Sequence, residues 1–272
     1  ISHIFAGSSW VNENHISFTR LRVFDLPLSA FGANVLKDLG ITGFPDDPFV
    51  DGLPALVVTN YEMVQDSNFL PQLQRDNLWS ASSSISRMQG RHTWKAGVEA
   101  RHFTMAYLQS QFARGQYQFN GSYTQDPLNP DNTGDPFADF LLGYASQTQR
   151  QTGTARAYFR QNNYAAYARD DWRIHSRVTL TAGLRYEYIA PFTEDGGNLL
   201  NLDYSKLPAQ PALRRTSSAT QPDRLGFAPR IGVAARLPHL LSRSRETVFR
   251  AGYGIYYSPE IAVQSYDLVR NG

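Results

Sequence analysis

The residues that could carry out catalysis are few and widely separated in this sequence. The chain has no cysteine and six histidines, and it contains no Gly-x-Ser-x-Gly, His-Glu-x-x-His or phosphate-loop motif. Asp170 and Asp171 are adjacent, but consecutive residues of a β-strand point to opposite faces, so their carboxylates cannot act on one bond. We therefore predict no enzymatic activity, no metal centre built from histidines and no cofactor. The histidines are His3, His15, His92, His102, His175 and His239.

One segment has oxygen-bearing side chains at alternating positions, as a calcium-binding loop does. In residues 129–134 (Asn-Pro-Asp-Asn-Thr-Gly) a glycine occupies the sixth position. The position where a calcium loop needs a bidentate Glu is Phe140, so the pattern fails where charge matters most. A turn rich in Pro, Asp and Gly explains the segment more simply. The sequence leaves calcium binding in residues 126–136 open.

Composition excludes several other classes of function. Of the 272 residues, 42% are hydrophobic, 13% are aromatic and 18% are charged. The formal net charge is +2 and the arginines are spread along the chain, whereas nucleic-acid-binding proteins gather basic residues on one face. No apolar run reaches the roughly 18 residues of a transmembrane helix. A membrane-spanning β-strand needs only every second residue to be apolar, so the negative mean hydropathy of -0.41 is compatible with the membrane.

The elements that would position side chains are amphipathic strands. In residues 177–188, apolar residues from Val178 to Tyr188 alternate with polar or small residues from Thr179 to Glu187, and a period of two is typical of a two-faced strand. Residues 164–174 alternate in the same way, although Asp170 falls on the apolar side. A four-residue separation predicts a tight hairpin between these two strands.

Three further hairpins repeat this pattern, in residues 4–24, 79–101 and 231–257. Long segments rich in Gly, Pro and Asp separate the hairpins, at residues 25–71, 115–150 and 191–225. Short turns that alternate with long loops are typical of an outer-membrane β-barrel. We therefore predict an all-β fold, namely part of an antiparallel up-and-down transmembrane barrel with short periplasmic turns and long extracellular loops.

The two faces of the predicted strands differ in chemistry. Because a charge at the bilayer midplane costs about 2–4 kcal/mol, the charged face is expected to line the lumen. The candidate lumen-facing residues are Lys95, Glu99, Arg101, Arg169, Asp171, Arg173, Arg185, Glu187, Arg230, Arg236 and Arg250. The candidate lipid-facing residues are Val178, Leu180, Ala182, Leu184, Tyr186, Tyr188, Ile231, Val233, Phe249, Tyr253 and Ile255. Outer-membrane lipid is thus an expected partner. The lumenal charges could pair with one another or with a plug, or they could line a path for an anionic or peptide-like solute.

Aromatic residues in the second long loop are candidate contacts for a sugar or peptide ligand. They are Tyr117, Phe119, Tyr123, Phe137 and Phe140. The simpler interpretation is that the loop packs on its own aromatic side chains.

Several short sequence segments resemble segments of the barrel of TonB-dependent receptors. Residues 162–173 (NNYAAYARDDWR) and 178–187 (VTLTAGLRYE) resemble a hairpin that recurs in that family. Residues 91–101 (RHTWKAGVEAR), 134–143 (GDPFADFLLG), 227–232 (FAPRIG) and 250–254 (RAGYG) are similar to the Oar-like branch, whose members often carry a carboxypeptidase-regulatory-like domain before the plug.

The resemblance implies a barrel of about 22 strands, an N-terminal plug, and import of a solute energised by a TonB-type protein. About eight to ten strands are expected in residues 1–272. The sequence has no signal peptide and shows no plug, TonB box or closing C-terminal strand, so we expect an internal piece of a longer protein. It does not identify the solute.

Three functions remain open at this stage. The first is the barrel segment of an Oar-like receptor that takes up a large or scarce solute such as a peptide, a carbohydrate or a chelate. The second is a structural or adhesive barrel whose loops bind partners without transport. The third is a soluble β-sandwich or accessory module, which requires short strands and a buried tyrosine face.

Overall fold

The structure is a computed structural model that describes residues 1–32, 34–44, 47–48, 51–67, 69–130, 133–151, 155–203, 212–237, 247–258 and 269. The chain forms two compact units. The strand unit comprises Ile1–Leu21, Asp76–Met105 and Tyr158–Gly272, and the loop unit comprises Arg22–Arg75 and Ala106–Ala157. Several strands begin in one unit and end in the other.

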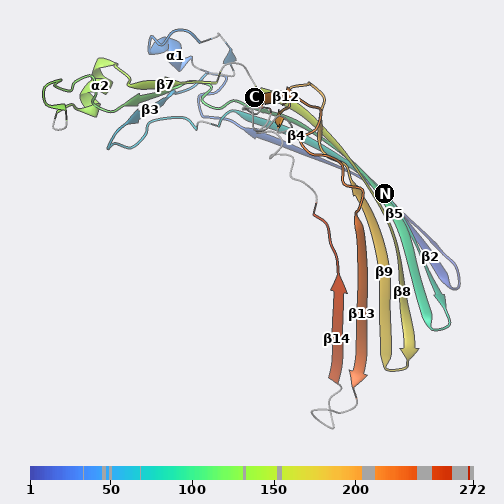
Figure 1. Ribbon diagram of the computed structural model, residues 1–272. Helices are drawn as coiled ribbons and strands as arrows, with labels where there is room; N and C mark the ends of the chain where they lie inside the picture. The colour runs from blue at the N-terminus through green and yellow to red at the C-terminus, as the bar shows by residue number, and fades with distance from the viewer. Residues whose placement is uncertain are drawn as a thin grey trace. The chain divides into compact units, whose positions relative to one another are not determined.

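One nine-stranded sheet contains the predicted hairpins, in the order β1-β2-β4-β5-β8-β9-β13-β14, with β10 paired to β8 (Figure 1). Every strand neighbours the next strand of the path along the chain, as an up-and-down meander requires. The strands β4, β5 and β8 have 18, 18 and 21 residues, far beyond the roughly 5–6 residues usual in soluble sheets. The bounds are β1 (Ser2–Ala6), β2 (Trp10–Asp25), β4 (Gln72–Gln89), β5 (His92–Gln109), β8 (Ala155–His175), β9 (Val178–Ile189), β10 (Thr193–Glu194), β13 (Phe227–Leu237) and β14 (Thr247–Gly254).

Short turns and long loops alternate as predicted. Two residues separate β4 from β5 and two separate β8 from β9. Gly90 in the first of these turns has a φ of 60°, a conformation that glycine adopts without steric cost. The predicted turn at residues 238–245 lies outside the described residues. The long connections follow β2, β5 and β9, so all three leave the sheet at the same ends of the strands.

The long loops carry more regular structure than their composition suggests. The first two loops contribute to one three-stranded sheet in which β3 (Ala55–Val58) runs parallel to β6 (Gln116–Phe119), and β6 pairs with β7 (Gln147–Gln149). They also contain the helices α1 (Val35–Asp38) and α2 (Pro136–Leu142). The third loop contains the antiparallel pair β11 (Leu200–Asp203) and β12 (Ala212–Arg215). Neither of the helices described is long and apolar enough to span a membrane.

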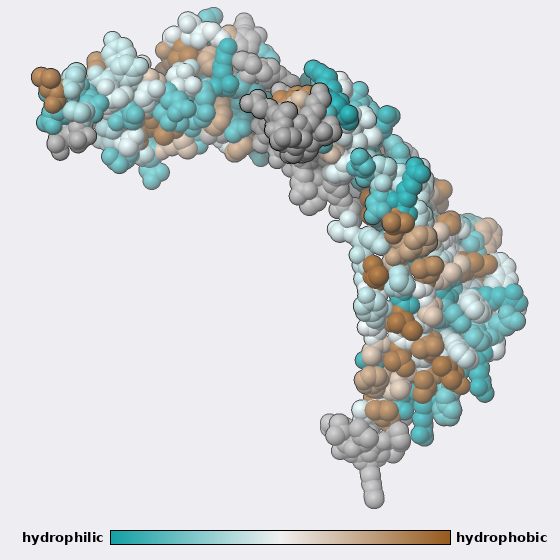
Figure 2. All heavy atoms as spheres, in the orientation of Figure 1, coloured by the Kyte–Doolittle hydropathy of each residue, from teal (hydrophilic) through white to brown (hydrophobic). Residues whose placement is uncertain are grey.

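The two units bury their side chains very differently. Leu36, Ala55, Val58, Ala113 and Phe119 form a core in the loop unit, each no more than 8% exposed. Residues 76–104 and 162–189 of the strand unit contain no buried residue at all. In the space-filling view, hydrophobic side chains gather on the surface over β9, β13 and β14 (Figure 2). The buried residues of the strand unit, such as Phe159, Phe192 and Leu199, lie outside these two stretches, so both faces of the sheet are left open there.

Candidate functional site

Most of the side chains predicted to line the lumen share one face of the sheet. In β8 and β9, Arg169 pairs with Gly183 and Asp171 with Thr181, while Arg185 lies opposite Tyr167. The same rows continue into β13 and β14, where they contain Arg230, Arg236 and Arg250. Directly paired residues point to the same face of an antiparallel sheet. We call this the polar face.

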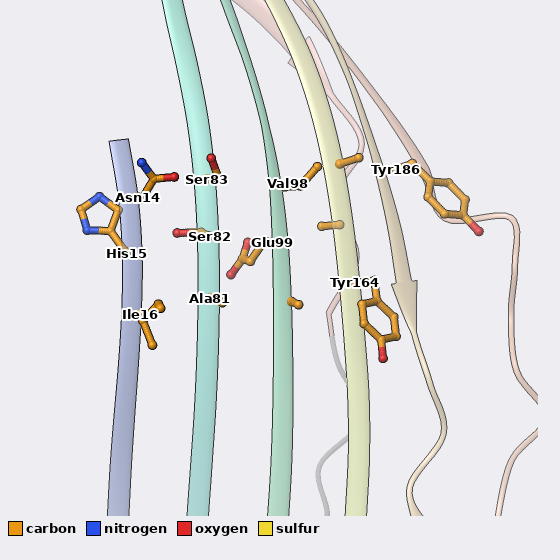
Figure 3. A pocket seen from close by; sticks show the side chains of 13 residues that line it. Asn14, His15, Ile16, Ala81, Ser82, Ser83, Val98, Glu99, Tyr164 and Tyr186 are labelled. Atoms are coloured by element: carbon orange, nitrogen blue, oxygen red, sulfur yellow. The ribbon is translucent and has the colours of Figure 1, made fainter. Parts of the chain in front are cut away.

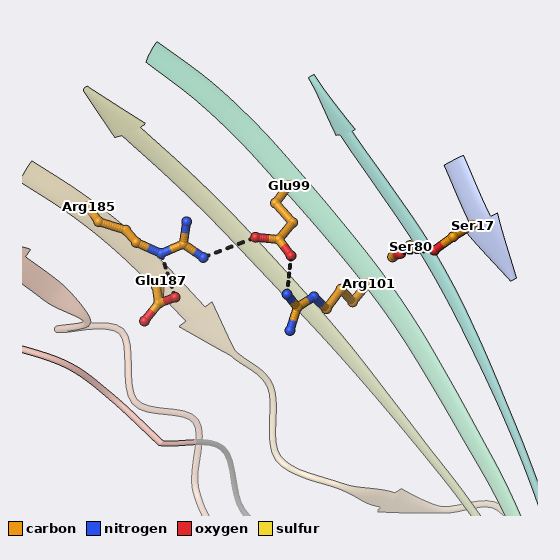
Figure 4. Close-up of polar contacts among 6 residues, drawn as sticks. All are labelled: Ser17, Ser80, Glu99, Arg101, Arg185 and Glu187. Carbon is orange, nitrogen blue, oxygen red and sulfur yellow. Dashed lines mark hydrogen bonds and ion pairs between the residues drawn. The ribbon is translucent and has the colours of Figure 1, made fainter. Parts of the chain in front are cut away.

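An ion-pair chain crosses the polar face from β5 to β9 (Figure 4). Arg185 donates from Nη2 to Glu99 Oε2 at 3.1 Å and from Nε to Glu187 Oε1 at 2.6 Å. Glu99 also pairs with Arg101. The side chains of Arg185, Glu99 and Glu187 are only about one-fifth exposed. Charge-assisted hydrogen bonds of this kind hold neighbouring strands in a defined register.

A second cluster lies further along the same face. Arg169 donates to Asp171 Oδ1 at 2.8 and 3.1 Å, and the Thr181 hydroxyl donates to the same oxygen at 2.5 Å. Lys95 Nζ lies 3.7 Å from Glu13 Oε2. Glu13 was not among the predicted residues because the alternation of β2 is irregular in sequence. The register leaves the face of Arg173 undefined, since the pairing shifts between Trp172 and His175.

The apolar residues lie on the opposite face, as their alternation predicts. Leu180 pairs with Trp172 and Val233, and Ala182 pairs with Ile231. Ile231 in turn lies opposite Tyr253. Ile255 follows the end of β14, where its N–H donates to the carbonyl of Pro229. We call this the apolar face. The assignment of the two faces to lumen and lipid remains a prediction.

The apolar face also explains Asp170, for which the sequence offered no partner. His92 Nδ1 lies 2.7 Å from Asp170 Oδ2, so a residue of β5 pairs with one of β8. The imidazole stacks between Trp94 and Trp172, with ring centroids 5.5 and 5.4 Å apart and interplanar angles of 12°. Two tryptophans thus cover the polar pair, and Asp170 Oδ1 is buried without a hydrogen-bond partner.

A groove of about 570 Å³ lies in the strand unit, lined by residues of β2, β4, β5, β8 and β9 (Figure 3). Small residues such as Ala81, Ala100 and Ala166 line it together with Tyr164 and Tyr186. Most of these side chains belong to the apolar face. The groove therefore offers volume but few polar groups that could orient a solute.

Comparison with known families accounts for a sheet that has two exposed faces of opposite chemistry. The outer membrane beta barrel domain family matches residues 2–272. The chain belongs to this family. As a barrel domain of the bacterial outer membrane it is all-β, and the soluble β-sandwich alternative is wrong.

A similarity to a solved structure was also found. The barrel domain is similar to the ferric-catecholate import receptor Fiu from K12 E. coli in its closed form, with a TM-score of 0.38 and 10% sequence identity. The alignment covers 85% of this chain and 29% of the Fiu chain, so this chain spans less than a third of that receptor. No curated protein matches the sequence.

The five aromatic residues predicted as ligand contacts of the barrel domain divide into two groups. Phe119 is 5% exposed and packs edge-to-face on Phe140, with centroids 5.4 Å apart. Tyr117 is partly covered within β6, and burial raises the pKa of its phenol while the nearby charge of Arg150 opposes that rise. Tyr123 and Phe137, by contrast, are 61% and 40% exposed. These last two are the most exposed of the five.

Exposed aromatic rings of the loop unit form two pairs. Phe137 stacks with Tyr61 at 5.3 Å, and Tyr123 lies 5.5 Å from Tyr144. Tyr61 and Tyr144 are 58% and 56% exposed. Neither was predicted, because stacking between residues far apart in the chain leaves no periodic trace in the sequence. Paired aromatic rings offer a rigid surface for sugar rings or apolar side chains.

A buried arginine organises the loops of the barrel domain. Arg114 is 3% exposed and donates to the backbone carbonyls of Leu53, Ser67 and Leu70 at 3.2, 2.8 and 2.9 Å. Burial lowers the pKa of this guanidinium from its ordinary value, and the charge of Asp66 opposes the decrease. Arg114 lies in the connection that follows β5, and its side chain therefore ties that connection to three residues of the first long loop.

The structure provides no support for a metal site in the residues that it describes. No group of three or more potential ligand residues comes together among them. In the candidate calcium loop, residues 131 and 132 lie outside the described residues. Asp139, which is fully buried nearby, accepts hydrogen bonds from the backbone N–H groups of Tyr123 and Thr124. Its carboxylate therefore holds the loop at residues 123 and 124.

Proposed function

We propose that this chain is part of the barrel of a TonB-dependent receptor, in the Oar-like branch, that imports a large or scarce solute across the outer membrane. The proposal rests on the short sequence segments that resemble that family. It also places a plug, and the segment contacted by a TonB-type protein, in parts of the protein outside residues 1–272. Peptides, carbohydrates and chelates are the solute classes that we consider, and no enzymatic step is proposed.

The structural observation that supports the proposal is the ion-paired polar face. A barrel that only anchors loops in the membrane needs a polar lumen, but it does not need a charge chain from β5 to β9. Side chains that are fixed by ion pairs give the polar face a constant shape toward a plug or a solute in the lumen. A polar face of constant shape suits a barrel that holds a plug and lets a solute pass.

The experiment compares two deletion strains of the source bacterium with the wild type. One lacks the complete receptor gene and the other lacks its TonB-type protein. Each strain grows in a complex medium, and the spent medium is profiled for residual solutes. We expect one solute class to remain in the medium of both deletion strains and to be consumed by the wild type. Equal consumption by the wild type and the receptor deletion strain would refute import.

The exposed aromatic pairs of the loop unit support a second candidate, an adhesive barrel whose loops bind a surface partner. Tyr61, Phe137, Tyr123 and Tyr144 would then provide the contact surface. Replacing all four by Ser should reduce attachment of cells to their substratum without changing solute uptake. Under the import proposal the same variant should reduce uptake, and attachment should be unchanged.

A further inference from the structure

The polar face has a pocket of about 330 Å³ whose lining contains four cationic side chains and no acidic one. The cations are Lys95, Arg169, Arg185 and Arg230, and Tyr167 and Thr181 also line the pocket. Arg230 comes from β13, whereas the other three come from β5, β8 and β9. Four strands therefore bring positive charge to one position on the polar face.

Gly183 creates the space between the cations. It pairs with Arg169 on one side and with Arg230 on the other, so two arginines flank a position without a side chain. A Cβ atom at position 183 would lie 3.3 Å from the carbonyl oxygen of Ala168 and 3.4 Å from Cβ of Arg169. Any larger residue would occupy the floor of the pocket.

Acidic residues outside the lining balance three of the four cations. Arg169 pairs with Asp171, Arg185 pairs with Glu99 and Glu187, and Lys95 lies near Glu13. Arg230 is different, because none of the ion pairs among the described residues includes it. Its guanidinium carbon lies 4.3 Å from the ring centroid of Tyr256, and its Nε is buried without a hydrogen-bond partner.

A buried donor without a partner is costly to a protein, and a cation over an aromatic ring is held in place without being neutralised. An oxyanion in the pocket would accept hydrogen bonds from the guanidinium groups and balance the remaining charge. Arginine suits such a ligand because its planar fork matches carboxylate and phosphate oxygens. The size of the pocket is at the lower end of the roughly 300–1,000 Å³ usual for small-molecule sites.

We propose that the pocket above Gly183 binds the carboxylate or phosphate group of a solute, with Arg230 as the principal contact and Arg169 and Lys95 as supporting cations. The inference rests on the proposed function, in which the polar face lines the path of a solute. It narrows the solute to one that carries an anionic oxygen group.

The test measures binding to the full-length protein in detergent at low ionic strength, by calorimetric titration. Inorganic phosphate and succinate are the two probes, so that the preference between phosphate and carboxylate is read directly. Arg230→Gln should weaken binding of the preferred probe about tenfold or more, the loss expected when a charge-assisted hydrogen-bonding partner is removed. Gly183→Val fills the floor of the pocket and should weaken binding similarly.

The matched control is Arg250→Gln, which removes the same charge from β14 on the same face. Arg250 pairs with Ala234 and does not line the pocket. The affinity of the Arg250→Gln variant for the probe should therefore stay within about twofold of the wild type. Each variant is first checked for assembly by its heat-modifiable mobility on gels. Absence of saturable binding to the wild type, or equal weakening by Arg230→Gln and Arg250→Gln, would overturn the inference. Binding is measured without energised import. The binding result therefore tests the pocket even if the receptor proves not to import a solute.

Discussion

The strand unit and the loop unit solve the problem of burial in opposite ways. The loop unit has an internal core around Phe119 and a buried arginine that satisfies three carbonyls. The strand unit has no buried residue over residues 76–104 or 162–189. Its two faces are apolar and polar, and both need an environment to cover them.

This difference indicates which forces stabilise each unit. The loop unit depends on the burial of apolar surface away from water, as soluble domains do. We predict that the strand unit depends on hydrogen bonds between strands and on lipid against its apolar face. A charged substitution should therefore destabilise the strand unit only when it lies on the apolar face. Loss of an internal contact of the loop unit should destabilise that unit alone.

The largest expected effect separates the two faces of one strand. Leu184→Arg places a charge on the apolar face, at a cost of about 2–4 kcal/mol near the bilayer midplane, and should prevent assembly. Thr181→Arg places the same charge on the polar face, where Asp171 is within hydrogen-bonding distance of position 181, and should be tolerated. Heat-modifiable gel mobility of the full-length protein measures both. Equal folding yields would refute the assignment of the faces to lipid and lumen.

The second prediction breaks the loop unit and leaves the strands intact. Arg114→Met removes the donors to three backbone carbonyls and should destabilise the loop unit by about 1.5–3 kcal/mol. Limited proteolysis of intact cells should then cut the first two long loops faster than in the wild type. The heat-modifiable mobility of the barrel should not change, and its loss would contradict the independence of the two units.

A smaller effect is expected at the polar pair on the apolar face. His92→Ala leaves Asp170 without a partner and should lower the free energy of unfolding by roughly 1–3 kcal/mol. The double variant His92→Phe, Asp170→Leu removes both polar groups and should recover most of that loss. Urea unfolding followed by tryptophan fluorescence provides the comparison. A double variant less stable than His92→Ala would show that the pair itself stabilises the sheet.

The smallest effect concerns the response of the loop unit to alkaline pH. Burial raises the pKa of the Tyr117 phenol above its unfolded value. The corresponding stability is therefore fully present below the unfolded pKa and is lost as the pH rises through the folded one. Protease resistance of the loops should fall above about pH 10, and Tyr117→Phe should make that fall shallower. An unchanged profile in Tyr117→Phe would assign the fall to other groups.

The strands were predictable because alternation is a local property. Each of the predicted hairpins is present, and apolar residues such as Leu180 and Val233 share a face because adjacent residues of any strand point in opposite directions. The loops were less predictable. The sequence of residues 55–58 does not show that they run parallel to residues 116–119, since that pairing joins two separate loops.

The sequence alone determined the strand pattern, the alternation of turns and loops and the two chemical faces, because these depend on spacing along the chain. Only the tertiary structure decided which charges meet. The pairing of His92 with Asp170, the ion-pair chain through Arg185 and the position of Arg230 beside Gly183 all depend on the register between strands. Register is set by contacts between residues far apart in sequence, and no local pattern records them.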